Sequence, residues 1–148
     1  MNFEGDLSLL QRKMAASSAG VQRRQAMMEA LNVRSGQSIL DLGCGGGHLV
    51  EELARAVGPH GKAFGLDPSK TQIQAARERC NRFDQATFFC CMADEIALKA
   101  ASCDAVASIQ TLEYIEDVDA ALSAVIPLLK AQSKFVNISI LWDHFKFH

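Results

Sequence analysis

An acid and three regularly spaced glycines follow a short apolar run near the start of the chain. Asp41, Gly43, Gly45 and Gly47 stand two residues apart; Asp41 belongs to the apolar segment 39–42, and the glycines lie between this segment and a helix-like stretch at 48–57. Because glycine has no Cβ, such a turn can bend sharply and let a ligand lie against the main chain. The unpaired N–H groups at the start of the following helix add hydrogen-bond donors. The pattern therefore predicts a nucleotide-binding turn.

The spacing of these glycines discriminates between two kinds of nucleotide site. A dinucleotide fingerprint reads Gly-x-Gly-x-x-Gly or Ala, and its small third residue lets the helix pack closely on the strand. That third place holds His48 when counted from Gly43, and Val50 when counted from Gly45. The turn is therefore a poor match for a nicotinamide-dependent reductase, which is the third function that we consider.

Two further acids follow apolar runs later in the chain. Asp67 ends the run 62–67, and a carboxylate there can accept hydrogen bonds from both hydroxyls of a ribose. Pro68 then opens the next helix. Asp94 follows the run 86–91; it can accept from an amine of a base, or it can cap a short helix over 95–100. Both acids are therefore candidates for contacts with a nucleotide.

Four motifs, in the same order, resemble those of the class I S-adenosylmethionine-dependent methyltransferases over about residues 20–143. They are the Asp-x-Gly-x-Gly-x-Gly turn, Asp67, Asp94, and a strand that begins at Cys103-Asp-Ala-Val106 and leads to Gln110. The similarity is to the small-molecule branch, which includes ubiquinone, menaquinone and sterol methyltransferases.

This resemblance implies that the cofactor is S-adenosylmethionine. Its amino-acid part would lie along the glycine loop, with Asp41 near its ammonium group. Asp67 would hold the ribose, and Asp94 the exocyclic amine of adenine. The cofactor-binding residues that we expect are Asp41, Gly43, Cys44, Gly45, Gly47, His48, Asp67, Pro68, Ala93, Asp94 and Gln110.

Five short apolar runs alternate with helical segments, which predicts an α/β fold with a parallel sheet. For 148 residues with 49% hydrophobic content we expect one domain, 1–148, with an N-terminal helical segment (1–35) and an α/β core (36–148). Right-handed crossovers and the resemblance together imply a Rossmann-like doubly wound sheet of order 3-2-1-4-5, with the site at its carboxyl edge. Strands are expected near 37–42, 62–67, 86–91, 104–109 and 134–141, and helices near 6–31, 48–57, 69–82 and 118–130, with a break in the first helix at 15–20.

Composition excludes several classes of partner. The formal net charge is −2, and the basic residues Arg12, Lys13, Arg23 and Arg24 are spaced as on a solvent-facing helix, so we expect no nucleic-acid partner. No apolar stretch approaches the roughly 20 residues of a membrane span. The first residues match neither a secretory nor a transit pattern, and we expect a cytoplasmic protein.

Neither the cysteines nor the terminal histidines indicate a metal site. The five cysteines form no Cys-x-x-Cys pair and are expected to be reduced thiols, although an arsenic-methylating enzyme would also use thiols on this fold. His144 and His148 stand one helical turn apart in an aromatic tail, which we interpret as a frayed terminus.

The chemistry implied by the resemblance is methyl transfer to a small-molecule acceptor. Positioning of donor and acceptor is its main requirement, so no catalytic residue is assigned; Glu113, Tyr114 and His144 are the groups that could serve as a base. Residues 129–133 lack the family's Pro-Gly-Gly turn, which should leave this turn less well specified.

The segment 135–142 is apolar and β-prone, and the family's two further C-terminal strands are missing after it. We expect its free edge to self-associate or to be covered by a partner protein. The alternative function is therefore a non-catalytic cofactor-binding or interaction module from a truncated methyltransferase.

Overall fold

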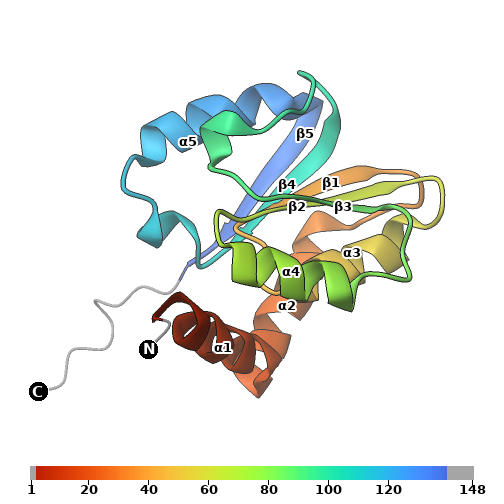
Figure 1. The fold of residues 1–148 in the computed structure, drawn as a ribbon. Coiled ribbons are helices and arrows are strands. Elements are labelled where there is room, and N and C mark those ends of the chain that lie inside the picture. Colours follow the sequence, from red (N-terminus) through yellow and green to blue (C-terminus); the bar gives the residue numbers. More distant parts are fainter. Residues whose placement is uncertain (1–2, 140–148) are drawn as a thin grey trace, which may run out of the picture.

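The computed structural model describes residues 3–139, and its centre is a five-stranded sheet (Figure 1). The strands are β1 (Ser38–Leu42), β2 (Lys62–Leu66), β3 (Ala86–Phe89), β4 (Cys103–Ile109) and β5 (Leu129–Ile138). Their order is β3-β2-β1-β4-β5, and every neighbouring pair is parallel. The expected fold class and strand order are confirmed.

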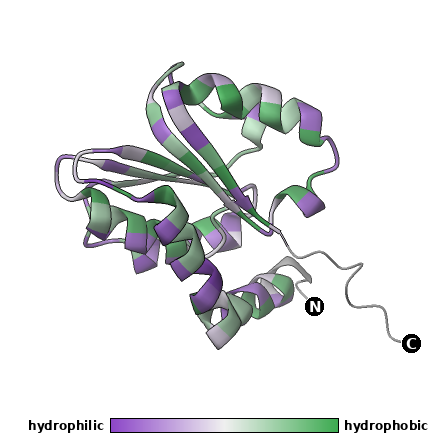
Figure 2. Cartoon of the chain, turned by 180° about the vertical axis from the view of Figure 1, so that it is seen from behind, coloured by the Kyte–Doolittle hydropathy of each residue, from purple (hydrophilic) through white to green (hydrophobic). Residues whose placement is uncertain are grey.

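Helices cover both faces of the sheet. Helices α2 (Ser18–Leu31), α3 (His48–Val57) and α4 (Lys70–Arg79) pack on one face, and α5 (Val118–Val125) packs on the other (Figure 1). Successive residues of a strand point to opposite faces, so Ile39 joins the first core and Leu40 the second. Both cores are apolar, and apolar residues dominate the central strands β1 and β4, whereas β5 carries polar residues along much of its length (Figure 2). Burial on both faces explains why the central strands β1, β2 and β4 are largely apolar.

The N-terminal segment is two helices, with the break where the sequence predicts it. Helix α1 (Phe3–Ala16) ends before Ser17, whose side chain accepts a hydrogen bond from the N–H of Gly20 and so caps α2. Met27 and Leu31 anchor α2 in the core. Helix α1 instead lies beside α2 and α4, at the carboxyl edge of the sheet (Figure 1).

The region between α5 and β5 differs from the expected boundaries. Helix α5 ends at Val125, and a short 3₁₀ turn, η3 (Ile126–Leu128), follows because Pro127 lacks the N–H that would continue the helix. Strand β5 begins at Leu129, five residues earlier than expected, but its pairing with β4 is irregular. Leu129 pairs with Cys103 and Lys134 with Ala105, so residues 130–133 form a bulge in the pairing, with Gln132 at φ +64°.

Two further elements are shorter than expected. Strand β3 ends at Phe89, and α4 ends at Arg79. The expected continuation of β5 to residue 141 lies partly outside the described residues. Within residues 3–139, no helix has the length and apolar character needed to cross a membrane.

Candidate cofactor site

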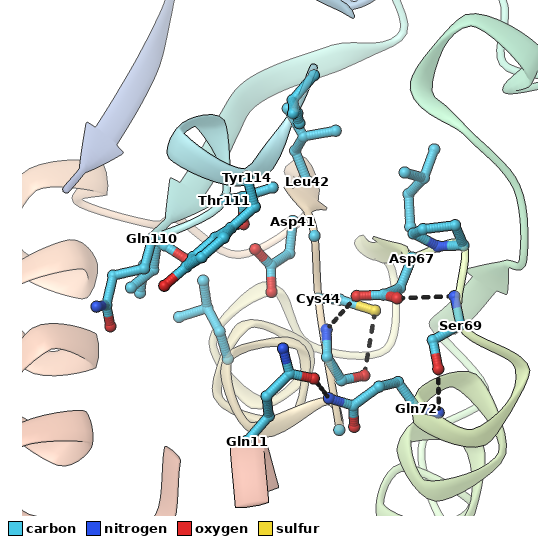
Figure 3. Close-up of a pocket in the computed structure, with 18 of the residues that line it drawn as sticks. Gln11, Asp41, Leu42, Cys44, Asp67, Ser69, Gln72, Gln110, Thr111 and Tyr114 are labelled. Atoms are coloured by element: carbon cyan, nitrogen blue, oxygen red, sulfur yellow. Dashed lines mark hydrogen bonds between the residues drawn. The ribbon is translucent and has the colours of Figure 1, made fainter. Parts of the chain in front are cut away.

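A cavity of about 1370 Å³ opens at the carboxyl ends of β1, β2 and β4, and its other side is formed by α1 and α2 (Figure 3). Ten of the eleven expected cofactor residues line it, and Gly47 does not. The topology brings them together because the ends of parallel strands meet at one edge of the sheet.

The glycine turn is held against the end of β2. The N–H groups of Gly43 and Cys44 both donate to the carbonyl oxygen of Leu66, at 2.8 and 2.9 Å. Gly45 has φ +52°, and a Cβ there would make only one ordinary contact, 3.7 Å from the side-chain nitrogen of Gln72. At Gly45 the absence of a side chain therefore leaves room for a ligand.

Gly47, at the end of the turn, lies against helix α4. A Cβ on this residue would lie 2.9 Å from Cα and Cβ of Ala76 in α4. The residue is buried and has φ +85°, so glycine here allows α3 and α4 to approach closely. Its neighbour Gly46, which the sequence did not single out, lines the cavity instead.

Asp41 and Asp67 point into the same cavity from neighbouring strand ends (Figure 3). Asp41 is only 4% exposed, and the described residues donate no hydrogen bond to its side chain. Burial, and then the negative charge of Asp67, raise the pKa of Asp41 well above its ordinary value. A cation placed in the cavity would offset both effects, as the ammonium group of S-adenosylmethionine would. The two carboxylates therefore fit the positive charge of this cofactor.

Asp67 is held in place by the turns on either side of it. Its Oδ2 atom accepts from the N–H of Gly45 at 3.1 Å, and its Oδ1 atom accepts from the N–H of Ser69 at 2.9 Å (Figure 3). Ser69 in turn caps α4 by accepting from the N–H of Gln72. These bonds fix the carboxylate on the cavity wall, and a carboxylate is a residue type that can accept hydrogen bonds from ribose hydroxyls.

His48 begins α3 and presents a neutral ring. Its Nε2 atom is buried and has no hydrogen-bond partner within the described part of the chain. Burial, together with the charges of Arg79 and Arg24, lowers the pKa of His48 to about 4. At neutral pH the imidazole therefore adds no charge to the cavity.

Asp94 stands on the rim of the cavity. It belongs to a 3₁₀ turn, η1 (Ala93–Glu95), and the expected helix over 95–100 does not form. Glu95, not Asp94, accepts from the N–H of Met92 at the start of this turn. The capping interpretation of Asp94 is therefore wrong, and its exposed carboxylate faces the cavity rim.

The wall opposite Asp67 comes from the segment after β4. Gln110 has φ +51°, and its N–H donates to the carbonyl oxygen of Ile138 at 2.7 Å, which ties this segment to β5. Thr111 packs against Gly43, where a Cβ would collide with its side chain. Tyr114, in the 3₁₀ turn η2 (Leu112–Tyr114), is 72% exposed and lines the cavity, whereas Glu113 does not line it and accepts from the hydroxyl of Ser139.

Thiols and metal ligands do not gather near the site. Burial, and then the charges of Asp41 and Asp67, raise the pKa of Cys44 well above its ordinary value, so it remains a thiol that packs in the turn. Cys90 is exposed and Cys91 is half-buried. Within residues 3–139, no three His, Cys, Asp or Glu side chains converge as metal ligands would, and His144 and His148 lie outside this range.

The contribution of α1 and α2 to the cavity was missed in the sequence. Their basic residues were expected to face solvent, but the side chain of Arg24 is 13% exposed and pairs with Glu52 at 3.2 Å. Arg12 donates to Ser8 at 2.6 Å and packs over Gly46. The sequence gives one indication that α1 has a buried or ligand-facing side. The spacing of Leu7, Leu10 and Met14 places them on one face of a helix.

Residues 33–144 match the profile of a methyltransferase-domain family, and this range holds the whole sheet and the acids at its edge. The chain belongs to this methyltransferase family. With the parallel sheet of order 3-2-1-4-5, it is a class I S-adenosylmethionine-dependent methyltransferase domain.

Two curated proteins are similar in sequence to this chain, and one of them is a named methyltransferase. An uncharacterised 37.1 kDa protein in a transposon of Streptomyces fradiae is 29% identical over 131 residues, which cover 88% of this chain and 38% of that protein. A ubiquinone biosynthesis O-methyltransferase of Rhodopseudomonas palustris is 31% identical over 102 residues, which cover 69% of this chain and 39% of the relative. The methyltransferase domain thus spans less than half the length of either relative.

Solved structures share the fold. A putative methyltransferase of Haloferax volcanii, in complex with the Trm112 methyltransferase activator, superposes with a TM-score of 0.78 at 22% identity, over 93% of this chain and 60% of that one. A phosphoethanolamine N-methyltransferase of Haemonchus contortus in complex with S-adenosyl-L-methionine gives 0.70 at 25% identity, over 78% and 27% of the two chains.

Proposed function

We propose that this chain transfers a methyl group from S-adenosylmethionine to a small-molecule acceptor. The observation that carries the proposal is the buried carboxylate of Asp41, which faces Asp67 across the cavity and receives no hydrogen bond from the described residues. Such a carboxylate is costly unless a cationic group joins it. In a methyltransferase domain, the cofactor provides that group.

The cavity residues divide between the parts of the cofactor. Asp41 and the turn at Gly43 to Gly46 would hold the amino-acid part, Asp67 the ribose, and Asp94 the amine of adenine. Pro68 and Ala93 would flank the adenosine side, and Gln110 the opposite side. The neutral ring of His48 adds no positive charge that would repel the cofactor's cationic groups.

The bound cofactor supplies an electrophilic methyl group on a sulfonium. The chain's own residues bind and orient the two reactants and exclude water, because in-line positioning provides most of the acceleration. Tyr114 lines the cavity and Glu113 does not, so Tyr114 is the candidate base within residues 3–139 if the acceptor is a hydroxyl. Names of relatives such as ubiquinone biosynthesis O-methyltransferase support a small-molecule acceptor.

Calorimetric titration with S-adenosylmethionine, S-adenosylhomocysteine and NADPH, followed by a screen for transfer of the labelled methyl group, tests this function. We expect binding of the first two ligands, no binding of NADPH, and transfer to a small molecule. Binding without transfer to any acceptor would support the non-catalytic module instead, and binding of NADPH alone would support a reductase.

A further inference from the structure

Exposed apolar side chains are concentrated on the cavity. Eight large hydrophobic residues of the described part are exposed, and five of them line this one cavity. These five are Leu7, Leu10, Met14, Met92 and Tyr114. Clusters of exposed apolar surface commonly mark a binding site. Their common position therefore indicates that a ligand with an apolar part covers them.

The apolar face of α1 is directed at the cavity by polar contacts on the same helix. Leu7, Leu10 and Met14 follow the spacing i, i+3, i+7 and so lie on one side of α1. Gln11 accepts from Gln72 of α4 at 2.8 Å, and Arg12 donates to Gln72 at 3.5 Å. These bonds set the rotation of α1 against α4, and the apolar side chains remain over the cavity.

The cavity is larger than one ligand requires. Its volume of about 1370 Å³ exceeds the roughly 300–1,000 Å³ that is typical of a small-molecule site. The cofactor would occupy the part near Asp41 and Asp67. The remaining part lies between α1, α2 and the segment that carries Tyr114 and Ile115.

Two adjacent arginines of α2 line this remaining part, and they differ in their partners. Arg24 pairs with Glu52 at 3.2 Å and also donates to the carbonyl oxygen of Ala15. Arg23 is half-buried and forms no ion pair with any residue of 5–139. A half-buried guanidinium without a counter-charge favours an anionic ligand, and its planar donors suit a carboxylate.

We propose that the methyl acceptor is an amphipathic acid, whose apolar body lies on Leu7, Leu10 and Met14 and whose carboxylate is bound by Arg23. This inference rests on the proposed methyltransferase function. Leu10 and Arg23 determine acceptor specificity, because one interacts with the apolar body and the other with the anionic group.

The test uses octanoate and 1-octanol as probes, which share a chain length and differ in the carboxylate. Each is titrated by calorimetry into the full chain, with and without saturating S-adenosylhomocysteine. We expect octanoate to bind about tenfold more tightly than 1-octanol, the scale of one charge-assisted hydrogen bond. Arg23→Gln should reduce octanoate to the level of 1-octanol, Arg23→Lys should recover part of the difference, and Leu10→Gln should weaken both probes.

Arg77→Gln is the matched control, because Arg77 is exposed on α4 and does not line the cavity; it should change neither affinity. Thermal unfolding of each variant confirms that it is folded.

Equal affinity for the two probes, or binding of neither, would overturn the proposal. So would a tenfold loss of S-adenosylhomocysteine affinity in Arg23→Gln, because Arg23 would then serve the cofactor's carboxylate. Octanoate binding by a chain that binds no cofactor would instead refute the methyltransferase function and retain the acid site.

Discussion

The N–H of Gly45 donates a hydrogen bond to the Oδ2 atom of Asp67 across 3.1 Å. This bond joins the glycine turn after β1 to the acid at the end of β2, two features that are 22 residues apart. The carboxylate therefore fixes the turn and faces the cavity at the same time, so we expect a change of this side chain to affect turn geometry and cofactor binding together.

Replacement of Asp67 by alanine should weaken S-adenosylmethionine binding by roughly 1.5–3 kcal/mol, the scale of a charge-assisted hydrogen bond left unmade. Loss of the bond to Gly45 adds to this effect by loosening the turn. Calorimetry measures the affinity, and circular dichroism confirms the fold. Asp84→Ala, at an exposed acid outside the cavity, is the control, and unchanged affinity in Asp67→Ala would remove the ribose assignment.

Gly45→Val should abolish cofactor binding while the chain still folds. The residue has φ +52°, so valine strains the backbone by about 1–2 kcal/mol, and its side chain enters the cavity. Gly36→Val separates the two effects, because Gly36 has φ +87° and open space around it but lies away from the cavity. We expect both variants to lower the melting temperature, and only Gly45→Val to lose the ligand. Normal binding by Gly45→Val would place the site elsewhere.

His48 should make the fold less stable in acid. Its pKa is about 4 in the folded chain and about 6.5 in an unfolded one, so below pH 6.5 the unfolded state binds more protons. The contribution of His48 to the free energy of unfolding therefore falls as the pH decreases from 6.5 toward about 4. Asp41 acts in the opposite direction, because its raised pKa makes the folded state take up a proton first.

The comparison of wild type with His48→Gln isolates the histidine. Urea unfolding of both proteins at several pH values between 4 and 7 gives the difference in stability. We expect this difference to change with pH in favour of His48→Gln as the solution becomes more acidic. A difference that is independent of pH would contradict the neutral, buried imidazole.

Gln132→Gly should stabilise the chain by about 0.5–1 kcal/mol. Gln132 has φ +64° in the bulge before the regular part of β5, a conformation that costs an L-residue energy and glycine almost none. Ala131→Gly is the control, since this exposed neighbour does not have a positive φ and should gain nothing. Thermal unfolding distinguishes the two, and a lower melting temperature for Gln132→Gly would show that side-chain contacts outweigh the strain.

The outer edge of β5 should mediate association between chains. Within the described residues, β5 pairs with β4 only, so its other edge has unpaired N–H and C=O groups. Asn137 is exposed on this strand, whereas Ile138 packs against the core, so Asn137→Lys is the variant that tests the edge without disturbing packing. Light scattering over a concentration series should show association that this lysine weakens. A monomer at all concentrations in both proteins would contradict the prediction.

Local sequence patterns, together with the family resemblance, were sufficient for the strand order and for the acids and glycines that line the cavity at the edge of the sheet. Buried parallel strands read as apolar runs, right-handed crossovers restrict their order, and the residues after each strand necessarily meet at one edge. For this reason Asp41, near the end of the first strand, and Gly45 and Asp67, just after strands, could be predicted to line one cavity.

Only the tertiary structure showed that α1 and α2 form one wall of the cavity. It also showed which glycines line the cavity and which one packs against a helix. The close approach of Gly47 to Ala76 and the bond between Arg12 and Gln72 join residues that are far apart in the chain. Periodicity shows that Leu7, Leu10 and Met14 share a face, but it cannot show which surface that face meets. That contact depends on where α4 and the glycine turn are placed by the sheet, and this is a property of the assembled fold.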